Sequence, residues 1–152
     1  MTIEEQIIKT FQDTSGISPG AASGELDAVL GGITAEKYVI VIYLEGGVKG
    51  AMALVMGKNQ ARAVSSKMLT IAAGMDFPPQ DIDDELASNS VGEIINIALG
   101  EYFMKRKNPA PVAISSPKYF EGEGGREQLR GLHDLISLTA EGETFYVLYR
   151  FS

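Results

Sequence analysis

The stretch KYVIVIYLEGGVKGAMALVMG, residues 37–57, has the pattern of a β-hairpin, and it decides the fold class. Its first part, residues 38–44, is a run of β-branched and aromatic side chains that is apolar on both faces of a strand. Gly46 and Gly47 follow, and paired glycines supply the positive φ angles of a tight turn. Residues 48–56 are then expected to return as the second strand.

A short helix is predicted before this hairpin. Thr2 and Glu5 have the spacing of a capping box, in which each side chain bonds the backbone N–H of the other residue. Gly16 has the position of a C-terminal glycine cap. The segment ISPGAASGE, residues 17–25, is rich in Ser, Pro and Gly and is expected to form a loop.

Two longer helices are predicted after the hairpin. The first lies in residues 58–74, and one of its faces is apolar: Ala61, Val64, Met68, Ile71 and Ala72. The second begins after acidic residues that the helix dipole favours, namely Asp81, Asp83, Asp84 and Glu85. It is expected to run to about Lys107, because Pro109 and Pro111 stop it.

The C-terminal third is predicted to return to strands. Residues 111–131 hold a short strand and a polar, glycine-rich loop. Residues 132–140 and 144–152 form two strands around a turn at Glu141 and Gly142. The order of elements predicts one α+β domain over residues 1–152, with a mostly antiparallel sheet and two long helices packed on one face.

Composition narrows the functional classes. The chain has 152 residues, 45% of them hydrophobic, which suits a single core. A net charge of −7 argues against a nucleic-acid binder, which needs a basic surface. The absence of cysteine excludes disulfides and thiolate chemistry. No signal peptide and no apolar run long enough to span a membrane is recognisable, so a soluble, cytoplasmic protein is expected.

The segment SNSVGEIINIALGEY, residues 88–102, carries the candidate site. At 100° per residue one side of this helix is apolar and is expected to face the core: Val91, Ile95, Ala98, Leu99 and Tyr102. The opposite side carries a carboxylate, a carboxamide and a position without a side chain: Asn89, Glu93, Asn96, Ile97 and Gly100. Glu93 and Asn96 lie one turn apart, at a Cβ separation of about 6 Å.

An Asn side chain both donates and accepts hydrogen bonds, so Asn96 can hold and aim a water molecule without a change of charge. Glu93 can pair with a cation or act as a general base. The rest of a phosphatase site is missing, since there is no P-loop and His133 is the single histidine. The pattern therefore fits a site whose phosphate and metal come from a partner. From spacing alone, however, ordinary solvated side chains are the commoner explanation.

The same helix resembles the CheC/CheX/FliY chemotaxis phosphatases, and CheX above all. The signature of that family is Asp or Ser, three residues, Glu, two residues, Asn, and a Pro about two dozen residues later. Glu93 and Asn96 match it, whereas Asn89 stands at the Asp/Ser position and Pro117 lies slightly early. The resemblance extends from about Val39 to the C-terminus, and a single such helix is typical of CheX.

This resemblance implies a function and a partner. The substrate would be a CheY-like response regulator that is phosphorylated on an aspartate of its receiver domain. Asn96 would orient the attacking water, and Glu93 would pair with the lysine of the regulator. Asn89, Ile97 and Gly100 would contact the partner. The Mg²⁺ ion would belong to the receiver domain, and this chain would bind no cofactor and no metal.

The sequence is also compatible with two functions other than catalysis, and it raises the question of a homodimer. The same fold can act as a non-catalytic module that docks a response regulator or another signalling domain, or as a structural dimerisation domain. A homodimer joined through sheet edges is expected, as in CheX-like proteins. Independently of the resemblance, residues 144–151 form a long apolar strand that needs covering, either at the centre of its own sheet or by a second chain.

Overall fold

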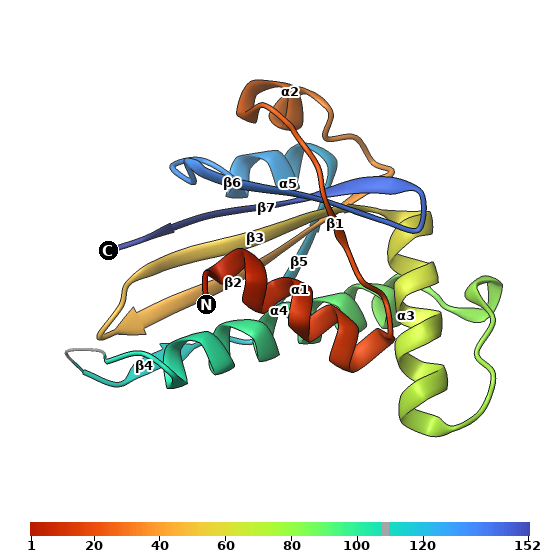
Figure 1. Ribbon diagram of the computed structural model, residues 1–152. Helices are drawn as coiled ribbons and strands as arrows, with labels where there is room; N and C mark the ends of the chain where they lie inside the picture. Colours follow the sequence, from red (N-terminus) through yellow and green to blue (C-terminus); the bar gives the residue numbers. More distant parts are fainter. Residues whose placement is uncertain (108–109) are drawn as a thin grey trace.

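The computed structural model describes residues 1–107 and 110–152, whose strands form an antiparallel sheet (Figure 1). The strands have the bounds β1 Gly20–Ala21, β2 Lys37–Gly46, β3 Gly50–Gly57, β4 Val112–Ile114, β5 Lys118–Glu121, β6 Asp134–Ala140 and β7 Glu143–Phe151. Their hydrogen-bonded order is β1-β6-β7-β3-β2-β4, and β5 also pairs with β2. The predicted fold class, a mixed α+β domain with an antiparallel sheet, is confirmed.

Helices cover both faces of this sheet (Figure 1). One face carries the longer helices, α1 Ile3–Ser15, α3 Lys58–Ala73 and α4 Asp84–Met104, and the short 3₁₀ helix η1 Pro79–Asp81 connects α3 to α4. The other face carries two short helices, α2 Leu26–Gly31 and α5 Gly122–Gln128. The predicted pair of long helices on one face is present, and α1 lies beside them.

The hairpin of β2 and β3 lies inside the sheet, which explains why it is apolar on both faces. Tyr38 and Ile40 are buried in the core between the sheet and the long helices. Val39 and Val41 point to the other face of the sheet and are buried in a second core, between the sheet and the short helices α2 and α5. The turn is at the predicted place, but the prediction for Gly47 is wrong: the positive φ angles are those of Gly46, at 93°, and Gly50, at 143°.

Most of the predicted helix ends are confirmed. Thr2 forms the capping box of α1, and Gly16 ends that helix with φ 71°. Helix α4 begins after Asp83, whose carboxylate accepts the N–H of Leu86 at 2.8 Å. It ends at Met104, three residues before the predicted end, and the predicted stop at Pro109 lies outside the described residues.

Two predictions for helices are wrong. Ile71 and Ala72 belong to the predicted apolar face of α3, but both are exposed because the last turns of this helix extend beyond the core. The glycine-rich segment expected to be a loop contains β5 and helix α5. One of the three glycines of α5, Gly125, has a packing role, because a Cβ there would lie 2.6 Å from the side chain of Val39. This glycine permits close packing on β2 and does not mark a loop.

Strand β7 lies at the centre of the sheet and not at its edge. It pairs with β3 on one side and with β6 on the other. Central placement thus covers the long apolar strand, and this strand gives no reason for a second chain. Among the helices of the described residues, none combines the length and the apolar character that crossing a lipid bilayer requires.

Candidate functional site

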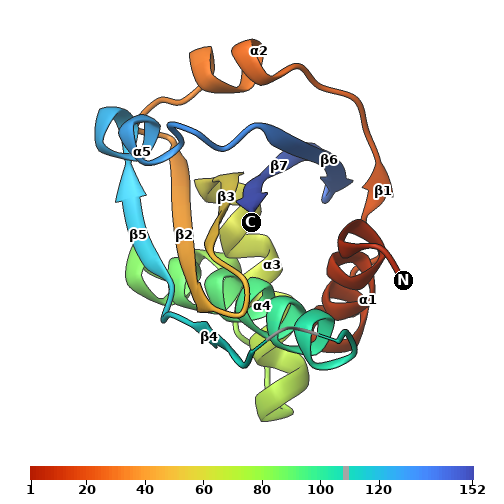
Figure 2. The ribbon, with the colours of Figure 1, turned by 90° about the vertical axis from the view of Figure 1, so that its left-hand side faces the viewer.

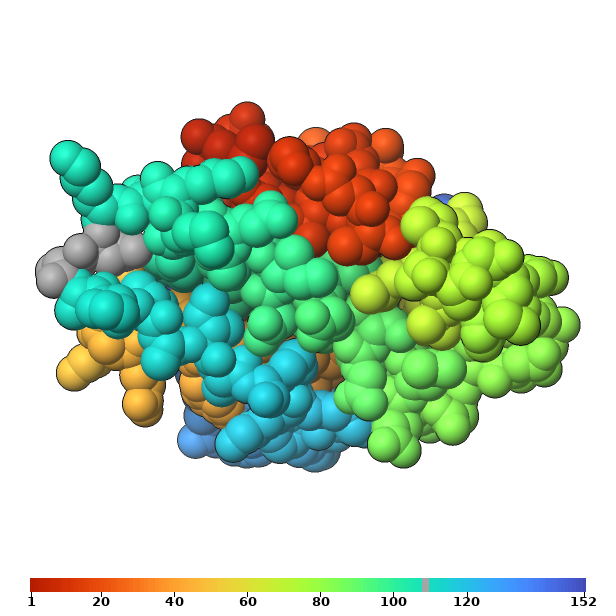
Figure 3. All heavy atoms as spheres, turned by 90° about the horizontal axis from the view of Figure 1, so that it is seen from below, coloured from red at the N-terminus to blue at the C-terminus, as the bar shows by residue number. Residues whose placement is uncertain are grey.

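The outer face of α4 brings the predicted site residues together. This helix is seen from outside in Figure 3, between α1 and the chain segment that follows α4. Asn89 and Glu93 are exposed, and three further residues of the same face are half-buried: Asn96, Ile97 and Gly100. The opposite side packs into the core as the helical period predicts, through Val91, Ile95, Ala98 and Leu99, with Tyr102 partly buried.

The carboxamide of Asn96 is held by a segment outside the helix. Its Nδ2 donates a hydrogen bond of 2.9 Å to the main-chain oxygen of Ser115, between β4 and β5. Among the residues that the structure describes, no group donates to the Oδ1 of Asn96. The side chain is therefore tied at its donor end, and its acceptor end is available to a ligand.

The segment that holds Asn96 is a bulge in the outer strand of the sheet. Leu44 of β2 pairs with Ile114 of β4. Further along, Val41 of β2 pairs with Lys118 of β5. Two residues of β2 separate these pairs, whereas the outer chain has three, Ser115–Pro117. One extra residue in one strand defines a β-bulge, a feature that often lies beside functional sites and redirects a group.

Ser115 fastens this bulge to β2. Its N–H donates to the carbonyl oxygen of Tyr43 at 2.9 Å. The N–H of Tyr43 donates in return to the hydroxyl of Ser115, also at 2.9 Å, and not to its carbonyl. The hydroxyl itself donates to the carbonyl oxygen of Ser116 at 3.1 Å. The carbonyl of Ser115 is thereby left to bind Asn96.

Pro117 packs the bulge directly on α4. Gly92, the neighbour of Glu93, is buried at this contact. A Cβ at Gly92 would lie 2.9 Å from the Cβ of Pro117 and 3.2 Å from a methyl of Ile40, closer than carbon atoms normally approach. The glycine therefore lets the helix, the bulge and β2 meet beside the candidate site.

A polar network fixes the first turn of α4. Asp84 accepts hydrogen bonds from the hydroxyl of Tyr38 and, at 2.9 Å, from the guanidinium of Arg62. The bond from Tyr38 and the positive charges of Lys58 and Arg62 lower the pKa of Asp84. Burial, and then this bond to Asp84, raise the pKa of Tyr38. The carboxylate of Asp84 thus serves as an anchor for the helix that carries the site.

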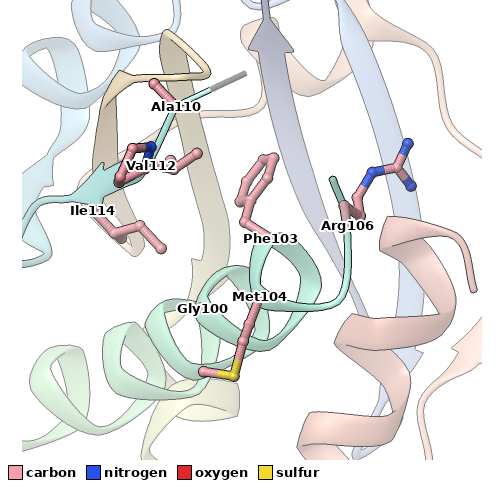
Figure 4. A pocket seen from close by; sticks show the side chains of 8 residues that line it. Gly100, Phe103, Met104, Arg106, Ala110, Val112 and Ile114 are labelled. Carbon is pink, nitrogen blue, oxygen red and sulfur yellow. The ribbon is translucent and has the colours of Figure 1, made fainter. Parts of the chain in front are cut away.

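A hollow of about 630 Å³ lies at the other end of α4 (Figure 4). Phe103 lines it from the helix, and Val112 and Ile114 line it from β4. Gly100 borders this hollow, and a Cβ added there would meet no atom within 4 Å. Gly100 is therefore an open position, one turn beyond Asn96, and not a packing glycine.

The described residues contain no cluster of three or more His, Asp or Glu side chains that would suit a metal ion. His133, which lies in the strand predicted over residues 132–140, is exposed just before β6. Sequence reasoning missed Ser115 and the role of Gly92. The sequence Ser-Ser-Pro could have indicated the role of Ser115. Pro lacks the N–H that a continuous strand needs, and a Ser hydroxyl can take the place of a backbone hydrogen-bond partner.

The comparison with protein families gives one match. Residues 38–140, more than half of the chain, match the family described as chemotaxis phosphatase CheX. This range includes Glu93, Asn96 and the bulge. No curated protein sequence matches the chain significantly.

Solved structures with the same fold include several CheX proteins. CheX from Vibrio vulnificus has a TM-score of 0.68 at 12% identity, over 99% of this chain and 93% of that one. CheX from Borrelia burgdorferi, in a complex with CheY, BeF₃ and Mg²⁺, has a TM-score of 0.65 at 18% identity, over 98% and 94% of the two chains. CheX from Desulfovibrio desulfuricans has a TM-score of 0.62 at 16% identity, over 99% and 96%. The family match and the shared fold agree, and the chain belongs to the CheX family of chemotaxis phosphatases.

Proposed function

We propose that this chain accelerates hydrolysis of the aspartyl phosphate on the receiver domain of a CheY-like response regulator. One observation carries the proposal: a member of this family presents Glu93 and Asn96 one turn apart on an accessible helix face. A relative with the same fold has been crystallised with CheY, BeF₃ and Mg²⁺, which supports a receiver domain as the partner.

Asn96 is the proposed catalytic residue that orients water. Its Oδ1 accepts a hydrogen bond from the water and aims the oxygen lone pair at phosphorus, in line with the bond to the aspartyl oxygen. Attack forms a P–O bond to the water oxygen and breaks the bond to the aspartate, releasing phosphate and a carboxylate. Positioning and electrostatic stabilisation supply most of the catalysis in such reactions.

Glu93 is the proposed electrostatic contact. Its exposed carboxylate pairs with the lysine of the receiver domain that lies beside the phosphate. Charge pairs of this kind improve encounter and register between two proteins. The Mg²⁺ ion is supplied by the receiver domain, and this chain contributes no metal ligand in the proposal.

Three further residues of the α4 face are proposed to contact the receiver domain. Asn89 offers a polar contact and Ile97 an apolar one on either side of Glu93. Gly100 lets the partner approach the helix backbone, because no side chain stands there and the hollow beside it is open.

A phosphate-release assay tests the proposal against the non-catalytic alternative. A CheY-like receiver domain is charged with acetyl phosphate, and phosphate release is followed with increasing amounts of this chain. We expect saturable acceleration, and a higher half-saturating concentration for Glu93→Ala. Binding to the BeF₃-activated receiver domain without acceleration would identify a docking module. Neither binding nor acceleration would contradict both functions.

We also propose a cytoplasmic homodimer that forms through the outer edge of β6. Strand β1 covers this edge only at Leu138 and Thr139. The carbonyl of Ser137 points outward, where it accepts the N–H of Ala22 at 3.0 Å. Backbone groups alternate along a strand, so Leu135 also directs its N–H and C=O outward. Pairing of two β6 edges would satisfy these groups and leave both α4 faces accessible.

A further inference from the structure

We infer that the bulge Ser115–Pro117 is the element that orients the carboxamide of Asn96, with Ser115 as the positioning residue. The inference rests on the proposed function, because it concerns the reaction that Asn96 is proposed to catalyse. It assigns no contact with substrate to Ser115, which acts through Asn96.

An asparagine on a helix surface has considerable side-chain freedom. Such a side chain samples several rotamers, and its terminal torsion is broad. The carboxamide is planar, so a hydrogen bond that fixes Nδ2 also fixes the direction of Oδ1. The bond of 2.9 Å from Asn96 to Ser115 supplies this restraint, and its acceptor belongs to the sheet and not to α4.

The carbonyl of Ser115 is available to Asn96 because the strand pairing with Tyr43 is irregular. In a regular hydrogen-bonded antiparallel pair, two residues exchange both of their N–H···O bonds. Ser115 and Tyr43 make only one of these two bonds in the regular way, from the N–H of Ser115. For the other, the hydroxyl of Ser115 replaces its carbonyl as the acceptor of the Tyr43 N–H. The hydroxyl therefore releases the carbonyl from the ladder and makes it available to Asn96.

The bulge lies in close contact with helix α4. Pro117 contacts α4 at Gly92, one turn before Asn96, where a side chain on the helix would force the two apart. A proline at this position also has no N–H to donate to β2, which favours an interrupted ladder. The bulge is held at one end by the contact of Pro117 with Gly92 and at the other by the hydrogen bonds of Ser115 with Tyr43. Together these contacts keep the carbonyl oxygen of Ser115 within hydrogen-bond distance of Asn96.

The variants Ser115→Ala and Ser115→Thr test the inference in the phosphate-release assay. In Ser115→Ala the N–H of Tyr43 loses its hydroxyl acceptor and draws the carbonyl of residue 115 toward β2, which turns this carbonyl away from Asn96. We expect kcat to fall on the order of 10-fold, because misplacement of a catalytic group by about 1 Å is costly. The half-saturating concentration of phosphorylated receiver should stay unchanged. Ser115→Thr keeps a hydroxyl and should restore kcat, and Ser23→Ala, in an exposed loop, is the matched control.

A second measurement reports on the bond without any receiver domain. The side-chain NH₂ of ¹⁵N-labelled Asn96, identified by its loss in Asn96→Asp, should exchange with solvent several-fold faster in Ser115→Ala than in the wild type. Unchanged exchange, an unchanged kcat or an increased kcat in Ser115→Ala would each overturn the inference. An increased kcat would show that the bond withholds Asn96 from the reaction. A wild-type protein without activity would instead contradict the proposed function itself, while the exchange rates still test the bond.

Discussion

The two edges of the sheet are built in opposite ways (Figure 2). At one edge, β4 and β5 cover β2, and the bulge between them directs a carbonyl group to α4. At the other edge, the two residues of β1 cover only part of β6. The first edge uses the carbonyl group of Ser115 within the molecule, whereas the second leaves part of β6 without a partner strand. We therefore assign the reaction to the bulged edge and assembly to the β6 edge.

The largest effect is expected for Asn96→Ala at the bulged edge. Loss of the group that orients water should lower the rate of dephosphorylation on the order of 10²-fold or more. The melting temperature should fall by only a few degrees, because the half-buried side chain of Asn96 contributes one hydrogen bond, to Ser115. Asn59→Ala, an exposed asparagine of α3, is the control and should keep full activity. A rate close to that of the wild type in Asn96→Ala would rule out the assigned role.

A smaller effect is expected for Gly100→Arg. The new side chain fills the open position beside the hollow, so it should raise the half-saturating concentration of phosphorylated receiver by about tenfold. The fold should be kept, since no atom lies within 4 Å of the new Cβ and Arg favours helix more than Gly does. Full activity with a large loss of thermal stability would contradict this account of Gly100.

Replacing each of two glycines of α4 by alanine distinguishes a glycine that packs against the bulge, Gly92, from one at an open position, Gly100. Gly100→Ala should stabilise the protein by about 0.5–1 kcal/mol through helix propensity. Gly92→Ala makes the same gain but forces its Cβ against the rigid ring of Pro117, and such overpacking costs about 1–3 kcal/mol. Urea unfolding of both variants measures the difference. Equal stabilisation of the two would show that the bulge does not depend on close contact with the helix.

The smallest effect is expected when the proposed dimer dissociates. Light scattering at micromolar concentration should give about twice 16.3 kDa, the mass of one chain. Dilution to monomers should leave the rate per chain unchanged, because the α4 face lies apart from the β6 edge. A monomer at all concentrations would contradict the dimer. A rate that falls on dilution would show that the two edges are not independent.

The periodicity of apolar residues was sufficient to predict the regular helices and strands of the molecule. The apolar face of α4, the central hairpin and the capping box of α1 were predicted because each depends on residues close in sequence. The same periodicity placed Glu93 and Asn96 on an accessible face. It said nothing of their neighbours, since the contact between Asn96 and Ser115 joins residues 19 positions apart.

The features that were missed depend on packing between distant segments. Glycines in α5 were taken as a sign of a loop, whereas Gly125 is needed for contact with Val39. Strand β7 was considered a possible edge, because a strand covered on both sides and an exposed apolar strand have the same composition. The bulge was missed because an extra residue is recognised only from the register of two paired strands.

The most direct test of the central claim is to map where an activated receiver domain contacts this chain. The chain is labelled with ¹⁵N and titrated with a CheY-like receiver domain in BeF₃ and Mg²⁺, and amide shifts are followed residue by residue. We predict the largest changes in residues 89–100 and in Ser115 and Ser116, with none in residues 134–138. Changes confined to the β6 edge, with the α4 face unaffected, would contradict the assignment of the reaction to the bulged edge.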